Sequence, residues 1–268
     1  MPLKATQAIV IGGHNLGEAD RIVVFFSRGV GKVRAVAAGA RRIRSRFGGC
    51  LELFTSGRLL YFERPNRDLH RVSEFAILHP YAGLRADLDR LAAGAYAVDL
   101  LRGAVEEGEP PGGLFDLLLG ILSELEDGPP SAAALRAYEV RLLCLLGYLP
   151  ELTRCVGCRR AAPQAASAAF SPRQGGLLCS TCRTAAPDPF PLGPEALGFL
   201  RGALRAEFQA AARAALPPAA LEELRALLRA AYQERVGRAP RSATFLEAVA
   251  ASPAPATGEN RRSQGDVR

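Results

Sequence analysis

The sequence predicts an α+β protein of several domains, in which a small N-terminal β-barrel precedes a helical domain with a cysteine-bearing insertion. Three observations predict this class. Short stretches rich in β-branched and aromatic residues fill the first 80 positions, helical patterns follow, and two C-x₂-C pairs interrupt the helices. The expected division is 1–80 for the barrel, 81–150 and 191–250 for the helical domain, 151–190 for the insertion and 251–268 for a disordered tail.

Five short strands are expected in the barrel, separated by Gly-containing breaks and one Pro-Asn pair. Their expected bounds are Ala5–Ile11, Arg21–Ser27, Lys32–Ala38, Leu51–Phe62 and His70–Ile77. The OB-fold is the commonest barrel of this size that binds oligonucleotides. An SH3-like barrel fits nearly as well, because periodicity alone does not order the strands.

Helical patterns cover five longer segments and a short one near the end of the chain. Their expected bounds are Leu84–Glu107, Leu114–Leu125, Ser131–Leu146, Pro194–Ala215 and Pro218–Arg235, with one or two further turns from Ser242. The third segment is the clearest, because Ser131 is a suitable N-cap and Gly147 can end the helix.

Composition favours a cytoplasmic protein. Hydrophobic residues make up 49% of the 268 positions, yet no apolar run is long enough to predict a membrane span. The first residues lack the pattern of a secretory signal. Six cysteines in such a chain indicate metal ligands or buried thiols rather than disulfides.

Positive charge is concentrated in the expected barrel. Residues 1–80 hold 13 Lys and Arg against 6 Asp and Glu, which accounts for the whole net charge of +7. A basic field confined to one module is typical of a protein that binds a polyanion.

The four cysteines of the insertion predict one structural Zn²⁺ site. Cys155 and Cys158 form one C-x₂-C pair, and Cys179 and Cys182 form the other after 20 intervening residues. Each pair can turn two thiolates toward one ion, and four sulfurs leave no open position for a substrate. Short strands at 168–170 and 177–178 would complete a zinc ribbon. The alternative, a thioredoxin-like redox pair, needs one such motif at the start of a helix.

The other two cysteines, Cys50 and Cys144, lie in apolar surroundings and are expected to be buried thiols.

A run of arginines between the third and fourth expected strands is the candidate nucleic-acid site. It contains Arg41, Arg42, Arg44 and Arg46. On the preceding strand, Lys32 and Arg34 should share one face, because side chains alternate at period two. A basic strand face that leads into a basic loop can follow a phosphate backbone.

No catalytic residues are expected. A phosphate-binding loop is absent, and the three histidines (His14, His70 and His79) have no metal-ligand spacing. Glu18 and Asp20 could belong to a two-metal nuclease site, but further carboxylates at compatible spacing are lacking. A protein that binds nucleic acid through its barrel, without catalysis, is therefore preferred over two alternatives. These are a transcription or translation factor that binds through its zinc ribbon, with Arg154, Arg159, Arg160, Arg173 and Arg183 nearby, and a metal-dependent nuclease.

With these residues in place, the chain resembles the RecO family of bacterial DNA-repair proteins over roughly residues 5–248. The likeness rests on motifs that are modest singly but specific in their order and spacing. They are Ala8-Ile-Val, Gly17-Glu-Ala-Asp20, Val24-Phe-Phe, Gly31-Lys32, Ala38-Gly-Ala-Arg-Arg42, Ser45-Arg46 and the ending Tyr232…Val236-Gly237…Arg241-Ser242…Phe245-Leu246. Two departures are Ser27-Arg28, where the family usually has Thr and an acidic residue, and the tail after Ser252.

The resemblance implies an N-terminal OB-fold, a helical domain and a zinc ribbon. It implies a nucleoid-associated protein that binds single- and double-stranded DNA, anneals complementary strands, and partners RecR. Such a protein helps to load RecA onto DNA coated by single-strand-binding protein. The family's DNA-binding positions correspond here to Lys32, Arg34, Arg41, Arg42 and Arg46. Some members lack the cysteines, so the metal is not required for the family's activity.

Overall fold

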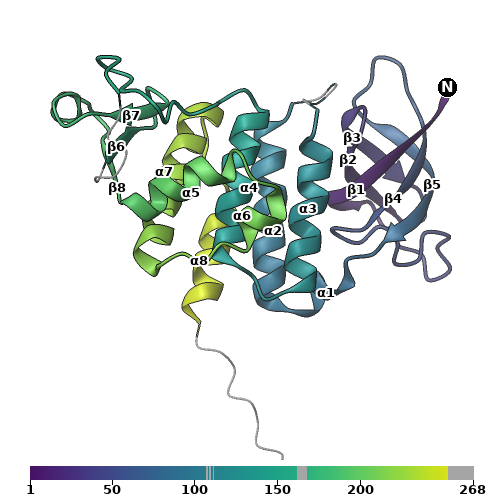
Figure 1. Cartoon of the computed structure of the whole chain (residues 1–268). Helices are drawn as coiled ribbons and strands as arrows, with labels where there is room; N and C mark the ends of the chain where they lie inside the picture. The colour runs from purple at the N-terminus through teal and green to yellow at the C-terminus, as the bar shows by residue number, and fades with distance from the viewer. Residues whose placement is uncertain (107, 109, 111, 162–167, 253–268) are drawn as a thin grey trace, which may run out of the picture.

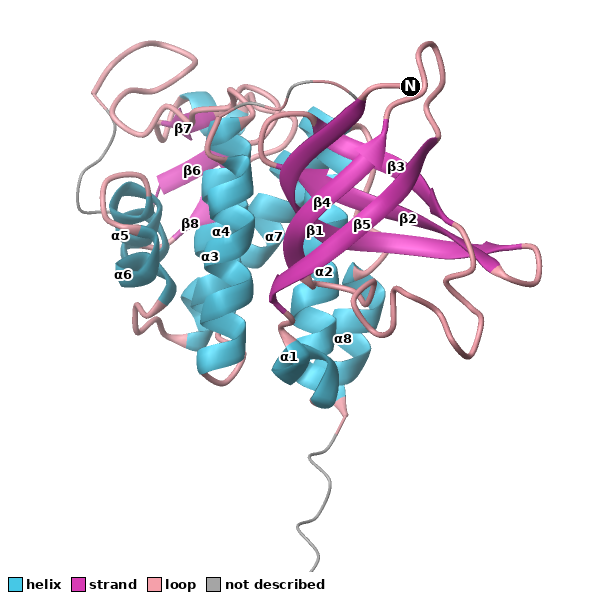
Figure 2. Ribbon diagram, turned by 90° about the vertical axis from the view of Figure 1, so that its right-hand side faces the viewer, coloured by secondary structure: helices cyan, strands magenta, loops and turns pink. Residues whose placement is uncertain are grey.

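The computed structural model describes residues 1–106, 108, 110, 112–161 and 168–252. A β-barrel forms one end of the molecule, a body of helices occupies the middle, and a small three-stranded sheet lies at the other end (Figure 1). A quarter-turn view shows the crossing strands of the barrel beside the helices (Figure 2). The predicted α+β class is therefore confirmed.

Five strands close the barrel in the order β1-β2-β3-β5-β4, and β1 pairs with both β2 and β4. They are β1 (Leu3–Leu16), β2 (Asp20–Ser27), β3 (Gly31–Ala37), β4 (Ser56–Phe62) and β5 (His70–His79). β3 and β5 are parallel, whereas the other pairs are antiparallel. This Greek-key order is that of the OB-fold and decides against the SH3-like alternative.

The fourth strand begins later than the expected Leu51–Phe62, because Leu51–Thr55 form turns rather than extended chain. Phe54 adopts a left-handed φ of 73°, and its backbone N–H donates to the Val10 carbonyl. Its ring is fully buried, and the Arg85 guanidinium binds the neighbouring Leu53 carbonyl at 2.6 Å. These apolar residues fill the space between barrel and helices, so their hydrophobicity does not indicate a strand.

The helical body contains eight helices among the described residues. They are α1 (Ala82–Ala86), α2 (Leu88–Ala104), α3 (Leu114–Asp127), α4 (Ala132–Leu145), α5 (Pro194–Ala203), α6 (Phe208–Ala212), α7 (Pro218–Val236) and α8 (Ala243–Ala251). The Ser131 hydroxyl caps α4 as predicted, accepting from the Ala134 N–H. Gly147, after the end of α4, adopts a φ of 90° that suits glycine.

Two expected helices are each divided in two. Leu84–Glu107 breaks at Asp87, which is extended and caps α2 by accepting from the Arg90 N–H. Pro194–Ala215 breaks between α5 and α6, at residues 204–207. Side-chain capping explains the first break, because Asp competes well for a free N–H at a helix start.

The barrel and the helical body share a hydrophobic core. Ile9, Ile11, Phe26 and Phe54 of the barrel segment belong to the same buried cluster as the helix residues. The rings of Phe26 and Phe115 stack with centroids 6.2 Å apart. Beside them, Arg28 forms a bidentate ion pair with Asp116 at 2.8 and 2.6 Å. These contacts dock the barrel on α3 and thereby position its outer surface.

The cysteine insertion forms a three-stranded sheet. The predicted ribbon is present as β6 (Ala168–Ser171) and β7 (Gly176–Leu178), and an additional strand, β8 (Phe190–Leu192), pairs with β6. The last described helix, α8, continues through Ala251, the first residue of the expected tail. The rest of that tail, from residue 253, lies outside the described residues. No described helix is both long enough and apolar enough to cross a lipid bilayer.

Candidate nucleic-acid interface and metal centre

The loop that follows β3, residues 39–46 (the basic loop), is tied to the β1–β2 hairpin at its start. The Asp20 carboxylate accepts from the Gly39 N–H at 2.8 Å. The Arg41 guanidinium donates to the Gly17 and Glu18 carbonyls at 2.8 and 3.1 Å. Asp20 is therefore a loop anchor, and Arg41 is both a surface charge and a structural clamp.

The remaining arginines of the basic loop are exposed to solvent. Arg46 lies over the Phe47 ring at 4.8 Å and donates weakly to the Val72 carbonyl at 3.4 Å. The side chains of Arg42 and Arg44 form no hydrogen bond or ion pair with any described residue. None of the four arginines pairs with a described carboxylate. Their charges are therefore not neutralised by the part of the protein that the structure describes.

Lys32 and Arg34 share one outer face of β3, as the alternation predicts. Val33, which lies between them, and Ala35, which follows Arg34, are both buried. Both side chains of the cationic pair line a groove between the barrel and the helical body, and Lys32 Nζ donates to the Arg102 carbonyl of α2 at 3.3 Å. Of the six predicted cations, two thus line this groove and four lie on the basic loop.

The same groove contains three arginines that were not predicted as site residues: Arg102, Arg238 and Arg241. They come from α2 and from the segment between α7 and α8. Their part of the sequence is balanced in charge, so no local excess marks them. Only the packing of the helices against the barrel brings them beside β3.

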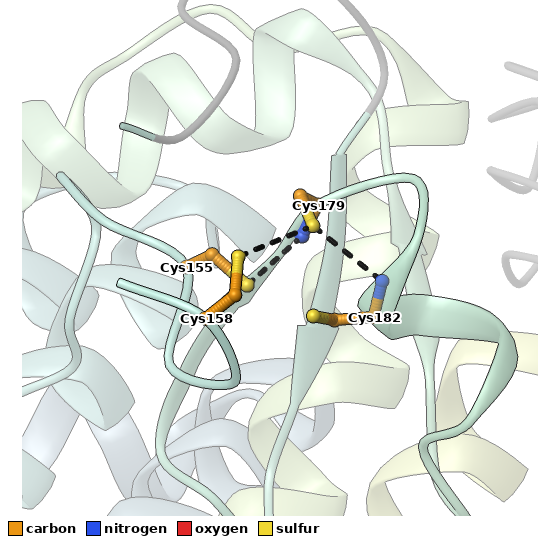
Figure 3. A group of neighbouring side chains, drawn as sticks. All are labelled: Cys155, Cys158, Cys179 and Cys182. Carbon is orange, nitrogen blue, oxygen red and sulfur yellow. Dashed lines mark hydrogen bonds between the residues drawn. The ribbon is translucent and has the colours of Figure 1, made fainter. Parts of the chain in front are cut away.

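The four cysteines of the insertion meet at one point (Figure 3). Cys155 and Cys158 lie on one loop, Cys179 directly follows β7, and Cys182 begins a short 3₁₀ helix, η1 (Cys182–Thr184). All four sulfur atoms lie within 4.8 Å of one another, and those of Cys158 and Cys179 are 3.7 Å apart. A tetrahedral ion with bonds of about 2.3 Å to sulfur has sulfur–sulfur edges of roughly 3.8 Å. The cluster therefore fits a metal ion.

Backbone N–H groups point at the sulfurs of Cys155 and Cys179, which favours thiolate at these two residues. The Cys179 N–H donates to Cys155 Sγ at 3.3 Å, and the Cys182 N–H donates to Cys179 Sγ at 3.4 Å. Burial opposes ionisation of Cys155, but the amides around it outweigh burial and lower its pKa to about 6. Gly157 leaves room for the cluster, since a β-carbon there would lie 3.0 Å from Cys182 Sγ.

The other two cysteines and two of the histidines have structural surroundings. Cys50 is buried and Cys144 is partly buried, and burial raises the pKa of both thiols. His70 Nδ1 accepts from the Arg64 N–H, and His79 Nε2 lies 2.6 Å from Glu126 Oε2. In the described part of the chain, the cysteine cluster is the one group of side chains placed to hold a metal ion.

Two family models match adjoining parts of the chain. The model described as "Recombination protein O N terminal" matches residues 1–81, and "Recombination protein O C terminal" matches residues 85–244. Together they span the barrel, the helical body and the cysteine insertion.

Curated relatives cover nearly the whole chain. A protein named "DNA repair protein RecO" from Anaeromyxobacter sp. (strain Fw109-5) is 38% identical over 247 residues, which is 92% of this chain and 96% of that protein. Its namesake from Roseiflexus sp. (strain RS-1) is 37% identical over 91% of this chain and 85% of its own length. Another, from Desulforudis audaxviator (strain MP104C), is 34% identical over 92% and 97%.

Proposed function

The chain belongs to the recombination protein O family of DNA repair proteins, and we propose that it acts by binding DNA as a recombination mediator. It binds single- and double-stranded DNA, anneals complementary strands and catalyses no covalent step. Its partners are RecR and single-strand-binding protein, and together they help RecA to assemble on coated DNA in the cytoplasm. These partners are proposed from the family membership.

The observation that carries the DNA-binding proposal is the basic loop. Arg42 and Arg44 are exposed and lack an ion-pair partner among the described residues, while Asp20 and Arg41 hold the loop against the β1–β2 hairpin. A loop that is fixed in place and carries uncompensated charge can bind phosphates with little cost in ordering. Neutralising phosphates also reduces the repulsion between two strands, which is the physical requirement for annealing.

For the cysteine cluster we propose one structural Zn²⁺. Cys155, Cys158, Cys179 and Cys182 would hold it, and four thiolates suit this ion and leave no position for a substrate. The small apolar cluster around Cys155, Ala169 and Leu178 provides little core of its own. The ion would therefore stabilise the insertion and take no part in chemistry.

The direct test removes the two unpartnered charges of the basic loop. We expect an Arg42→Ala/Arg44→Ala variant to bind every oligonucleotide more weakly, measured by fluorescence anisotropy across a salt series. For single strands, the slope of log K against log [salt] should become shallower by roughly 1.4, which corresponds to two lost phosphate contacts. Unchanged affinity and slope would overturn the DNA-binding role of the loop.

A matched control separates this proposal from the zinc-ribbon alternative. Arg159 and Arg160 are exposed arginines beside the cysteine cluster. Their replacement by Ala should leave binding unchanged. Loss of binding in this control, with normal binding by the loop variant, would instead support a factor that binds nucleic acid through its ribbon.

Strand annealing and RecA assembly on coated DNA, with and without RecR, test the mediator step. Intact DNA after incubation with Mg²⁺ or Mn²⁺ is expected.

A further inference from the structure

A groove of about 720 Å³ lies at the surface between the barrel and the helical body. Its barrel wall includes the outer face of β3, and its helical wall includes α2 and the start of α8. We call it the basic groove because five cations line it: Lys32, Arg34, Arg102, Arg238 and Arg241.

The charge of the basic groove is largely uncompensated. Asp99 is the carboxylate in its lining, and its Oδ2 already accepts from the backbone N–H and the hydroxyl of Ser242, both at 3.0 Å. Four of the groove's cations form no ion pair with any carboxylate that the structure describes: Arg34, Arg102, Arg238 and Arg241. Like charges gathered between low-dielectric walls reinforce one another, so the groove attracts anions strongly.

Two of these arginines lie close against glycine backbone. A β-carbon on Gly12, at the β1 bulge, would come within 3.1 Å of Arg102 Nη1. A β-carbon on Gly103 would come within 3.1 Å of Arg238 Nη2 and 2.3 Å of the Tyr232 hydroxyl. That hydroxyl is itself fixed, since it donates to the Leu100 carbonyl at 2.8 Å. The absence of a side chain at both glycines lets the guanidinium groups settle beside the groove wall.

One aromatic ring completes the groove. Phe245, on the first turn of α8, lines it and is 42% exposed. Single exposed hydrophobic side chains are common on protein surfaces, but this ring lies beside the cations of the basic groove. A row of cations beside an exposed aromatic is the combination that binds single-stranded nucleic acid, in which phosphates meet arginine and a base stacks on the ring. A duplex hides its base faces and cannot use the ring in this way.

We propose that the basic groove binds one nucleic-acid single strand, with its phosphates on Arg34, Arg102, Arg238 and Arg241 and a base stacked on Phe245. The proposal rests on the DNA-binding function proposed above and extends it from the barrel to the helical body. The strand leaves the groove past His14, which also lines it. The hairpin beyond His14 is the one that Arg41 clamps, so the basic loop continues the same path.

The test uses the full-length protein and fluorescent single-stranded and duplex oligonucleotides of equal length. An Arg238→Ala/Arg241→Ala variant should bind single strands more weakly, with a salt slope shallower by roughly 1.4. A Phe245→Leu variant should lose roughly 5-fold to 150-fold in single-strand affinity, because stacking is lost, while its salt slope stays unchanged. Duplex affinity should change much less in both variants. Arg205→Ala, an exposed arginine outside the groove, is the matched control and should bind normally.

The outcomes separate this inference from the proposed function. If the groove variants bind like the parent while Arg42→Ala/Arg44→Ala binds weakly, the groove proposal fails and the function of the basic loop stands. Equal loss on single strands and duplex would overturn the single-strand assignment. Normal DNA binding with loss of binding to a partner protein would make the groove a protein-docking surface. Thermal unfolding of each variant checks that the exposed substitutions leave the fold intact.

Discussion

The buried ring of Phe54 lies directly against Gly94 of α2, where a β-carbon would come within 2.9 Å of the ring. Phe54 belongs to the turn before β4, and Gly94 lies in the first half of the long helix that packs beneath the barrel. Barrel and helical body therefore fit together at a point where one extra carbon is not accommodated. This fit holds the β3 face opposite α2 and so defines the walls of the basic groove.

We expect Gly94→Ala to destabilise the protein by about 1–3 kcal/mol, because the fully buried Phe54 ring has no free space to move into. The measurement is the midpoint of urea unfolding. Gly198, an exposed glycine inside α5 with nothing near its β-position, provides the control. Gly198→Ala should stabilise the protein by up to about 1 kcal/mol, because alanine favours the helix. A stable Gly94→Ala variant would contradict the close fit.

Arg41 and Arg44 should differ in their effects on stability, although both belong to the basic loop. Replacing Arg44 with Ala should weaken DNA binding and leave unfolding unchanged. Replacing Arg41 with Ala should weaken binding and also cost up to about 1 kcal/mol, because its hydrogen bonds to Gly17 and Glu18 are lost. Anisotropy and urea unfolding on the same preparations check both effects. Equal stability of the two variants would show that Arg41 is not a clamp.

The proposed zinc site is tested by Cys158→Ser. We expect the parent protein to carry one zinc per chain by mass spectrometry and the variant to carry none, because an exposed ligand of the cluster is removed. Proteolysis should then cut faster within the insertion, while oligonucleotide affinity stays the same. Cys144→Ser is the control, since this thiol lies outside the cluster. Zinc retained in Cys158→Ser, or absent from the parent, would rule out the proposed site.

A buried ion pair inside α4 should be strongly coupled. Arg136 Nη2 lies 2.8 Å from Glu139 Oε1, both side chains are buried, and the Tyr96 hydroxyl donates to the same oxygen at 2.6 Å. Arg136→Met leaves the carboxylate without its countercharge and should cost about 3–5 kcal/mol. The double variant with Glu139→Leu should be more stable than the sum of the single changes implies.

An exposed ion pair provides a comparison for the stability effect of breaking the buried Arg136–Glu139 pair. Lys4 and Glu63 lie 3.5 Å apart near the start of the chain, and Lys4 is half exposed. Lys4→Met should change the free energy of unfolding by less than about 1 kcal/mol, because water screens the charges. Additive effects at Arg136 and Glu139 would count against the predicted coupling.

Expectations that rest on local spacing agree with the structure. The two C-x₂-C pairs each form a tight knuckle, and the four sulfurs meet because the Val156 N–H donates to the Leu177 carbonyl of β7, which leads into Cys179. The β3 alternation places Lys32 and Arg34 together because side chains alternate along a strand. The prediction of one continuous helix was wrong at Asp87. The Asp87 side chain caps the start of α2, and this local hydrogen bond divides a segment whose apolar pattern is continuous.

The sequence by itself determined the separate strand and helix segments, the two C-x₂-C pairs and the basic loop, since each depends on residues that are neighbours along the chain. The strand order of the barrel depends on pairing between distant segments. Tertiary structure alone decided how the barrel docks on α2 and α3 and what the groove between them contains. Arg34, Arg102 and Arg241 are far apart in the sequence and sit in differently charged segments. They share one surface only because burial of Phe26 and Phe54 brings the barrel onto the helices, and a contact of that kind leaves no periodic signal in the chain.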